Sequence, residues 1–222
     1  MLFILTGNVQ TGKTRWLESL LGDLETRGVS ISGVLAPGVW RELPDNAGFE
    51  KLGIDNVLLP QGERLVFARR QDLAEAEGLY DADSQSAQAN LKWEMPEDSL
   101  DRVNAHLRSL VFGDASSVAA GSDDVGSANT SFADTRSDVT AFASMLVIDE
   151  VGRLELLRNG GLTAALDILD AGPSSLFDHT LVIVREALLP AALERFEPVW
   201  GSVSVVSPDE TGREALFAAF GL

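Results

Sequence analysis

The sequence predicts an α/β fold, in which a mostly parallel sheet is flanked by helices and carries one added antiparallel β-hairpin. Short apolar runs alternate along the chain with segments of helical period, an order typical of stacked βαβ units. The length of 222 residues and the 45% share of apolar residues suit one such domain over residues 1–222. The expected strands cover residues 2–6, 30–35, 145–149, 180–184 and 202–206.

Helices are expected between these strands. Leucines at helical spacing predict the first helix over residues 14–27: Leu17, Leu20, Leu21 and Leu24. Gly28 supplies the left-handed residue that commonly ends a helix. The same periodicity predicts helices over residues 97–111 and around residues 162–169. A capping box is expected to open the last helix, with Ser207 as N-cap, Pro208 as the first helical residue and Glu210 as the third.

Two segments depart from this alternation. Residues 56–69 predict two short strands around Gln61 and Gly62, which together make the antiparallel hairpin. Residues 113–143 are rich in Ser, Ala and Asp, a composition that buries too little apolar surface to offset the entropy lost on ordering. We expect a mobile insertion there, and a lid over the site is the alternative.

Charge and composition exclude several classes of protein. The net charge is −17, with 17 basic against 34 acidic residues, which opposes the binding of nucleic acid because that requires a basic surface. The absence of cysteine excludes disulfides and thiolate metal sites. No apolar run approaches the length of a membrane helix, and the apolar start is too short for a signal peptide. We therefore expect a cytoplasmic protein without a membrane or nucleic-acid partner, and leave a protein partner open.

A phosphate-binding motif follows the first expected strand. Residues 7–14 match G-x-x-x-x-G-K-[ST], the P-loop or Walker A pattern, at every fixed position. The motif lies between an apolar strand and an amphipathic helix, and backbone N–H groups of such a loop hold nucleotide phosphates together with the positive end of the helix. The expected fold is therefore that of a P-loop NTPase. The residues expected to bind the nucleotide are Gly7, Asn8, Val9, Gln10, Thr11, Gly12, Lys13, Thr14 and Arg15.

Two side chains at the end of this motif have specific expected roles. Lys13 is expected to reach the β- and γ-phosphate oxygens and to assist catalysis, and the Thr14 hydroxyl is expected to bind Mg²⁺, the expected cofactor. Lys13 is also one of only three lysines in the chain. The pattern predicts that the bound small molecule is a nucleoside triphosphate, ATP or GTP.

A second motif is a buried strand that ends in two carboxylates, S-M-L-V-I-D-E at residues 144–150. The carboxyl end of a parallel strand lies beside the phosphate loop, as in a Walker B motif. Asp149 is expected to hold Mg²⁺, and Glu150 to orient and deprotonate an attacking water. The presence of Glu150 favours hydrolysis over transfer to a second substrate.

Arginines are candidates for neutralising the charge that develops on the transferred phosphoryl group. Arg185 is the strongest candidate, because it ends the expected strand at residues 180–184 on the same edge of the sheet. Arg153, just beyond the acidic strand, and Arg15, beside the phosphate loop, are weaker ones.

The acidic motif also carries a family resemblance. V-I-D-E-V-G-R-L-E-L at residues 147–156 resembles the I-D-E-[IV]-G-x-[ML]-E-L signature of the THEP-type nucleoside triphosphatases. The resemblance implies a RecA-like P-loop fold with an extra β-hairpin, and Mg²⁺-dependent hydrolysis of nucleoside triphosphates with loose base specificity. It implies that Gly152 permits a tight turn and that Glu155 supports the site from behind. The site residues to which it extends are Gly12, Lys13, Thr14, Asp149 and Glu150.

These observations favour a Mg²⁺-dependent nucleoside triphosphatase that cleaves the β–γ phosphoanhydride bond. One alternative is a P-loop kinase for a small metabolite, although residues 113–143 offer only Arg136 where kinase lids carry several arginines. Another alternative is a nucleotide-dependent adaptor with slow turnover. The insertion and the hairpin, with Arg64, Arg69 and Arg70, would form its contact surface.

Overall fold

The computed structural model describes residues 1–8, 12–112 and 143–222. Its strands are β1 (Leu2–Leu5), β2 (Ser30–Leu35), β3 (Gly38–Glu42), β4 (Phe49–Leu59), β5 (Glu63–Arg70), β6 (Trp93–Glu94), β7 (Ser144–Val151), β8 (His179–Val184) and β9 (Val203–Val206). Its α-helices are α1 (Lys13–Thr26), α2 (Gln71–Glu77), α3 (Gln85–Gln88), α4 (Glu97–Phe112), α5 (Arg153–Arg158), α6 (Thr163–Ala171), α7 (Leu189–Trp200) and α8 (Glu210–Ala219). Short 3-10 turns cover Pro44–Asn46 (η1) and Glu186–Leu188 (η3).

Within the described residues one nine-stranded sheet organises the fold. Its order is β6-β5-β4-β2-β7-β8-β1-β9, with β3 paired to β4. The strands β2, β7, β8, β1 and β9 run parallel to their neighbours in this series, and these are the strands expected from the sequence. The pairings from β2 through β4 and β5 to β6 are antiparallel. The prediction of a mostly parallel sheet flanked by helices, with an added antiparallel part, is confirmed.

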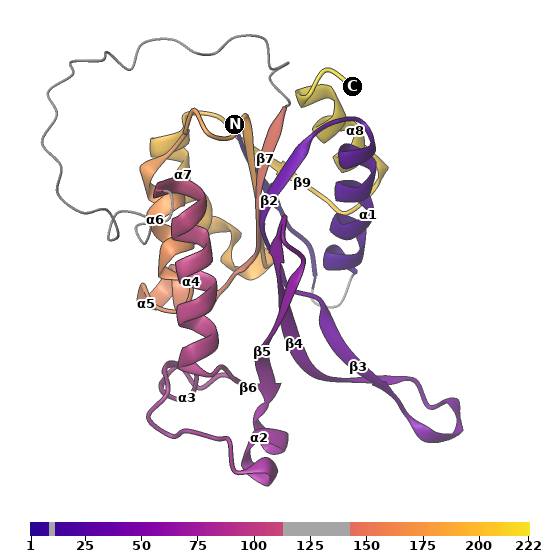
Figure 1. Ribbon diagram of the computed structural model, residues 1–222, viewed down its shortest axis with the longest axis vertical. Coiled ribbons are helices and arrows are strands. Elements are labelled where there is room, and N and C mark those ends of the chain that lie inside the picture. Colours follow the sequence, from indigo (N-terminus) through magenta and orange to yellow (C-terminus); the bar gives the residue numbers. More distant parts are fainter. Residues whose placement is uncertain (9–11, 113–142) are drawn as a thin grey trace, which may run out of the picture.

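Helices cover both faces of the sheet (Figure 1). On one face lie α4, α5, α6 and α7, and apolar side chains such as Leu107, Leu169 and Phe196 pack there in one cluster. On the other face lie α1 and α8, whose Leu20, Leu24 and Leu216 belong to a second cluster. The leucines that predicted α1 are all buried, and Gly28 has the expected left-handed φ of 86°.

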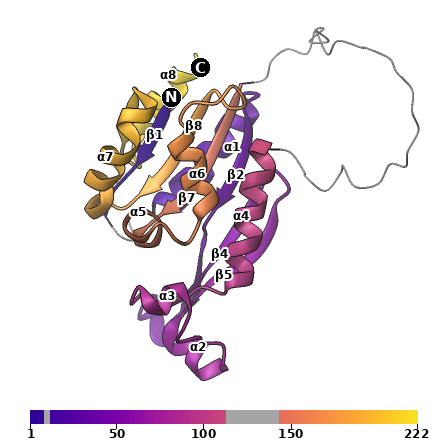
Figure 2. The same ribbon diagram turned by 90° about the vertical axis from the view of Figure 1, so that its left-hand side faces the viewer.

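The hairpin is longer than predicted. Instead of two short strands within residues 56–69, β4 and β5 span Phe49–Leu59 and Glu63–Arg70. Figure 2 shows their far ends projecting beyond the parallel strands, together with α2 and α3. The strands β3 and β6, which the sequence did not predict, pair with β4 and β5 and widen this antiparallel part.

The predicted capping box of the last helix is wrong. The N-cap of α8 is Asp209, whose carboxylate accepts a hydrogen bond from the backbone N–H of Gly212 at 2.9 Å. Asp209 has the extended backbone of an N-cap residue, with φ −138° and ψ −176°. Its backbone N–H also donates to the carbonyl of Ser207 at 2.9 Å, so Ser207 and Pro208 belong to the preceding turn and not to the helix.

The expected insertion at residues 113–143 lies outside the described residues, apart from Ala143, and its alternative role as a lid stays a prediction. In the ranges that the structure does describe, none of the helices combines the length and the apolar character needed to cross a membrane.

Candidate functional site

The phosphate-loop motif lies between the end of β1 and the start of α1. Gly12 is the N-cap of α1 and has a left-handed backbone with φ 82°, a conformation that favours glycine. Lys13 is 8% exposed, and its ammonium group donates hydrogen bonds to the carbonyls of Gly7 at 2.9 Å and Asn8 at 2.7 Å. Val9, Gln10 and Thr11, which were also predicted to bind the nucleotide, lie outside the described residues.

The two predicted carboxylates lie at the carboxyl end of β7, on the same cavity as Thr14. Asp149 is 2% exposed, and its Oδ2 accepts a hydrogen bond from the backbone N–H of Ala36 at 3.1 Å. Burial raises the pKa of Asp149 to about 6, although hydrogen bonds from Ala36 and Thr14 oppose this rise. A buried carboxylate whose ionised form is destabilised in this way gains strongly from a nearby cation.

Glu150 faces the cavity beside Arg185. The Nε of Arg185 donates to Oε1 of Glu150 at 2.5 Å, and both side chains are partly exposed. Arg185 directly follows β8, which lies between β7 and β1 in the sheet. The strand order therefore brings this arginine between the acidic motif and the phosphate loop. Burial lowers the pKa of Lys13, and the carboxylate of Glu150 opposes this shift more than any other group.

Thr14 and Asp149 provide oxygen ligands of the kind that Mg²⁺ prefers. A hydroxyl and a carboxylate beside the predicted phosphate loop fit this ion, which usually keeps several waters and binds phosphate oxygens as further ligands. Among the described residues, no group of three or more His, Cys, Asp or Glu side chains is arranged to hold a metal by itself. Mg²⁺ binding at Thr14 and Asp149 would therefore need phosphate oxygens of a nucleotide as further ligands.

Glu155 lies behind the site and fixes the chain after β7. Its Oε2 accepts from the N–H of Gly152 at 2.8 Å and its Oε1 from the N–H of Leu162 at 3.0 Å. Burial raises the pKa of Glu155, and these two hydrogen bonds oppose the rise. The carboxylate therefore ties the start of α5 to the segment that precedes α6.

The glycine that this arrangement requires is Gly161. The expectation of a tight turn at Gly152 is not supported, because its φ of −113° is open to any residue. Gly161 has φ +65°, and a Cβ at that position would lie 2.1 Å from Oε1 of Glu155. The close approach of Glu155 to the backbone therefore depends on Gly161, which the sequence motif did not identify.

The weaker arginine candidates are differently placed. Arg153 lines the cavity from the first turn of α5, whereas Arg15 is exposed on α1 and does not line it. Two of the hairpin arginines suggested as an adaptor surface are paired with carboxylates: Arg64 with Asp55, and Arg70 with Glu50 and Asp72.

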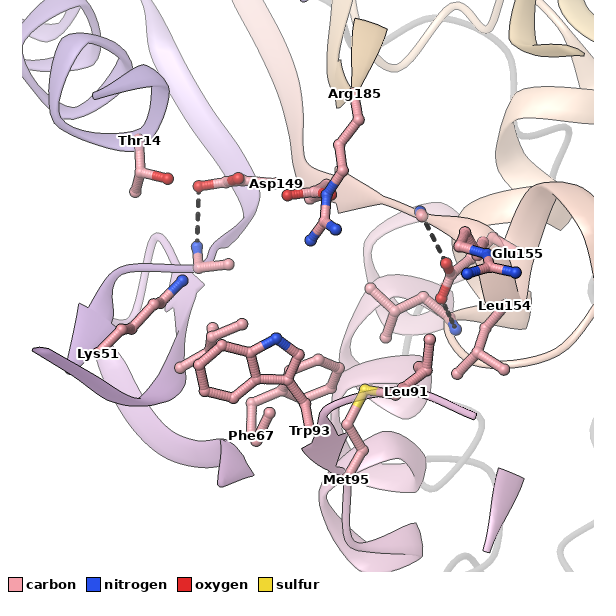
Figure 3. A pocket seen from close by; sticks show the side chains of 17 residues that line it. Thr14, Lys51, Phe67, Leu91, Trp93, Met95, Asp149, Leu154, Glu155 and Arg185 are labelled. Carbon is pink, nitrogen blue, oxygen red and sulfur yellow. Dashed lines mark hydrogen bonds and ion pairs between the residues drawn. The ribbon is translucent and has the colours of Figure 1, made fainter. Parts of the chain in front are cut away.

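Sequence reasoning missed one part of the cavity, its wall on the antiparallel strands. Lys51 and Ile54 come from β4, Phe67 from β5, and Trp93 from β6, and all four line the same cavity as Asp149. Figure 3 shows Lys51 and Trp93 facing this space from below, opposite Asp149 and Arg185. The scarcity of lysine was a usable signal, since Lys51 is one of only three in the chain.

A solved structure supports the assignment of the fold. The solution structure of a human cancer-related nucleoside triphosphatase is similar to this chain with a TM-score of 0.52 and 19% sequence identity. The similarity covers 99% of this chain and 94% of that chain. Neither a protein-family model nor a curated protein sequence matches the chain. At this identity the likeness shows the fold alone, so the chain has the mixed α/β fold of that nucleoside triphosphatase.

Proposed function

We propose that this protein is a Mg²⁺-dependent nucleoside triphosphatase that cleaves the β–γ phosphoanhydride bond of ATP, GTP and related nucleotides. The observation that carries the proposal is the convergence of Thr14, Asp149, Glu150 and Arg185 on one cavity. The start of helix α1, which bears the P-loop lysine Lys13, is next to this cavity. The similarity in fold to a human nucleoside triphosphatase supports the same class of reaction.

Binding begins with the phosphates. In the structure the Lys13 ammonium rests on two carbonyls of its own loop, and in the complex it would donate to the β- and γ-phosphate oxygens instead. Thr14 and Asp149 would hold Mg²⁺, which neutralises charge on these phosphates when it is bound. The buried Asp149 is fixed for this task by the N–H of Ala36.

Hydrolysis then uses the side chains across the cavity. Glu150 would accept a proton from a water whose oxygen attacks the γ-phosphorus, while the bond to the β–γ bridging oxygen breaks and the nucleoside diphosphate leaves. The 2.5 Å hydrogen bond from Arg185 orients the Glu150 carboxylate. The guanidinium also adds positive charge on the side where negative charge develops.

The test is phosphate release from ATP, GTP, CTP and UTP, each measured with and without Mg²⁺. We expect release to require Mg²⁺ and to fall at least about 100-fold in Lys13→Ala, because a cation that stabilises the transition state is lost. Lys92→Ala is the matched control, since Lys92 is also a lysine but is exposed and does not line the cavity. Release that is equal in Lys13→Ala and wild type would reject the proposal, and a phosphorylated metabolite among the products would favour the kinase alternative.

A further inference from the structure

The cavity continues from the polar site into an apolar chamber. We call the apolar chamber the part lined by Ile54, Phe67, Leu91, Trp93, Met95 and Leu154. The polar site and the apolar chamber together have a volume of about 150 Å³, and a space of that total size accepts one benzene-sized ring. The proposed hydrolysis, in which Glu150 accepts one proton from water, leaves this apolar chamber without a role.

A nucleotide bound at the phosphate loop would not fill this chamber. This step rests on the proposed function: the γ-phosphate of a P-loop nucleotide points toward the Mg²⁺ ligands and the catalytic carboxylate, and its base points away from them. Most of the chamber wall comes from β4, β5 and the segment around β6, and Leu154 of α5 completes it. In the sheet these strands lie beyond β2 and β7, on the side opposite to β1 and β9. The chamber therefore lies past the γ-phosphate, away from the base.

One cation, the Lys51 ammonium, lies at the mouth of the chamber without a direct ion pair among the described residues. Among the residues described, the Lys51 ammonium forms no ion pair and no hydrogen bond. It lies over the rings of Trp93, at 5.4 Å from the centroid, and Trp40, at 5.9 Å. Burial lowers the pKa of Lys51, and the charges of Glu150 and Asp149 oppose this shift. The charged form is poorly solvated and would gain from an anion in direct contact.

The carboxylates of the cavity are already engaged. Glu150 pairs with Arg185, Glu155 accepts two backbone N–H groups, and Asp149 accepts from Ala36 beside Thr14. Two cationic side chains that line the cavity, Lys51 and Arg153, form no ion pair among the described residues, and Lys51 is the one that lies over Trp93. Figure 3 shows its amine at the boundary between the polar site and Trp93.

We propose that the apolar chamber binds a second small molecule, one with a flat apolar body and a single carboxylate-like anionic group. The apolar body packs between Trp93, Phe67 and Met95. The anionic group pairs with the Lys51 ammonium, whose position over two indole rings already excludes part of its water shell. The ligand lies next to Glu150, so it is bound beside the γ-phosphate and does not replace the nucleotide.

Benzoate is the probe, because it combines a ring with a carboxylate. Benzyl alcohol keeps the ring without the charge, and acetate keeps the charge without the ring. In ligand-observed NMR titrations of the full chain we expect saturable benzoate binding, and binding at least about tenfold weaker for the other two, a difference of about 1.4 kcal/mol. Absence of saturable benzoate binding, or equal binding of all three probes, would overturn the proposal.

Variants of the chamber test its location. Lys51→Met should weaken benzoate binding about tenfold or more, whereas Lys92→Met, which removes the exposed lysine near β6, should leave it unchanged. Leu91→Trp fills the chamber from a half-buried wall position and should also reduce binding, which covers the case in which Lys51→Met does not fold. Unchanged binding in a folded Leu91→Trp or Lys51→Met protein would contradict the assignment.

A nucleotide competition separates this proposal from the proposed function. Benzoate should still bind in the presence of a saturating non-hydrolysable ATP analogue with Mg²⁺, which fills the γ-phosphate position, and it should bind to Lys13→Ala as it does to wild type. Displacement of benzoate by adenosine would mean that the chamber holds the base, which would overturn the second-ligand site. Loss of nucleotide binding with benzoate binding intact would instead count against the nucleoside triphosphatase alone.

Discussion

The parallel and antiparallel halves of the sheet supply the cavity in different ways. On the parallel half, residues at strand ends give the groups that we propose to react: Asp149 and Glu150 follow one another at the end of β7, and Arg185 follows β8. On the antiparallel half, single side chains from different strands, such as Lys51 and Trp93, form a wall. Changes on the parallel half should therefore alter turnover, and changes on the antiparallel half should alter which second ligand binds.

Glu150→Gln should give the largest effect. Glutamine has nearly the same shape but does not accept the proton of an attacking water, so we expect kcat to fall about 100-fold. Binding of the Mg-nucleotide should stay within about threefold, since the phosphate loop is untouched. Steady-state phosphate release and calorimetry measure the two quantities, and Glu214→Gln, at an exposed position on α8, serves as the control. Equal turnover in Glu150→Gln and wild type would mean that Glu150 does not act as the base in hydrolysis.

Glu155→Ala should affect stability. The substitution leaves the N–H groups of Gly152 and Leu162 without their acceptor, and a buried unpaired donor costs about 1–3 kcal/mol. We expect the free energy of unfolding in denaturant to fall by about 2 kcal/mol. Leu157→Ala, on the exposed face of the same helix, should change it by less than about 0.5 kcal/mol. A loss for Glu155→Ala as small as that of the control would contradict the assigned role.

The stabilising effect of Glu155 should depend on pH. Because burial raises the pKa of Glu155 in the folded protein above its ordinary value, its contribution is complete below the unfolded pKa and is lost as the pH rises through the folded pKa. The difference in unfolding free energy between wild type and Glu155→Ala should therefore be larger in acid than at neutral pH. Denaturant titrations of both proteins across this range give the difference, and the opposite trend would be inconsistent with the buried carboxyl.

Arg185→Met should reduce turnover less than Glu150→Gln. The substitution removes the 2.5 Å hydrogen bond that orients Glu150 and one positive charge, and a hydrogen bond to a charged group is worth about 1.5–3 kcal/mol. We expect kcat to fall about tenfold or more, with little change in the binding of Mg-ADP. Arg185→Lys, which keeps the charge without the planar donor group, should recover part of the loss. If Arg185→Met has full activity, Arg185 acts only as a surface ion pair.

Gly38→Ala, in the antiparallel half of the sheet, should have the smallest effect on binding and turnover. A Cβ at this position would lie 2.8 Å from Cε of Lys51 and 2.6 Å from Nε1 of Trp40. The two side chains would shift, so we expect benzoate to bind about threefold more weakly while kcat stays within about twofold. Titration and turnover of the same preparation measure both. A large loss of kcat with unchanged benzoate binding would contradict the prediction that the antiparallel half affects ligand binding and not turnover.

The sequence predicts the two halves unequally, for a physical reason. The phosphate loop and the acidic strand are contiguous motifs whose chemistry fixes residue type and spacing, so Lys13, Thr14 and Asp149 can be predicted from the sequence alone. The chamber depends on which strands become neighbours, and the short β6 with Trp93 has no periodicity that would reveal it.

Two further predictions, the N-cap of the last helix and the turn glycine, were wrong because nearby residues compete for the same structural role. Ser207 and Asp209 both precede the last helix, and only the three-dimensional turn decides that the carboxylate of Asp209 caps it. The family resemblance implies a tight turn at Gly152. The structure requires glycine at Gly161 instead, because the Glu155 carboxylate packs directly against the backbone there.

Calorimetry with a non-hydrolysable ATP analogue and Mg²⁺ shows whether residues 7–14 hold a nucleoside triphosphate, because it measures binding without depending on turnover. We expect saturable binding of one nucleotide per chain by wild type and by Glu150→Gln, and a loss of at least about tenfold in affinity for Lys13→Ala. Uptake that is absent in wild type, or unchanged in Lys13→Ala, would contradict it.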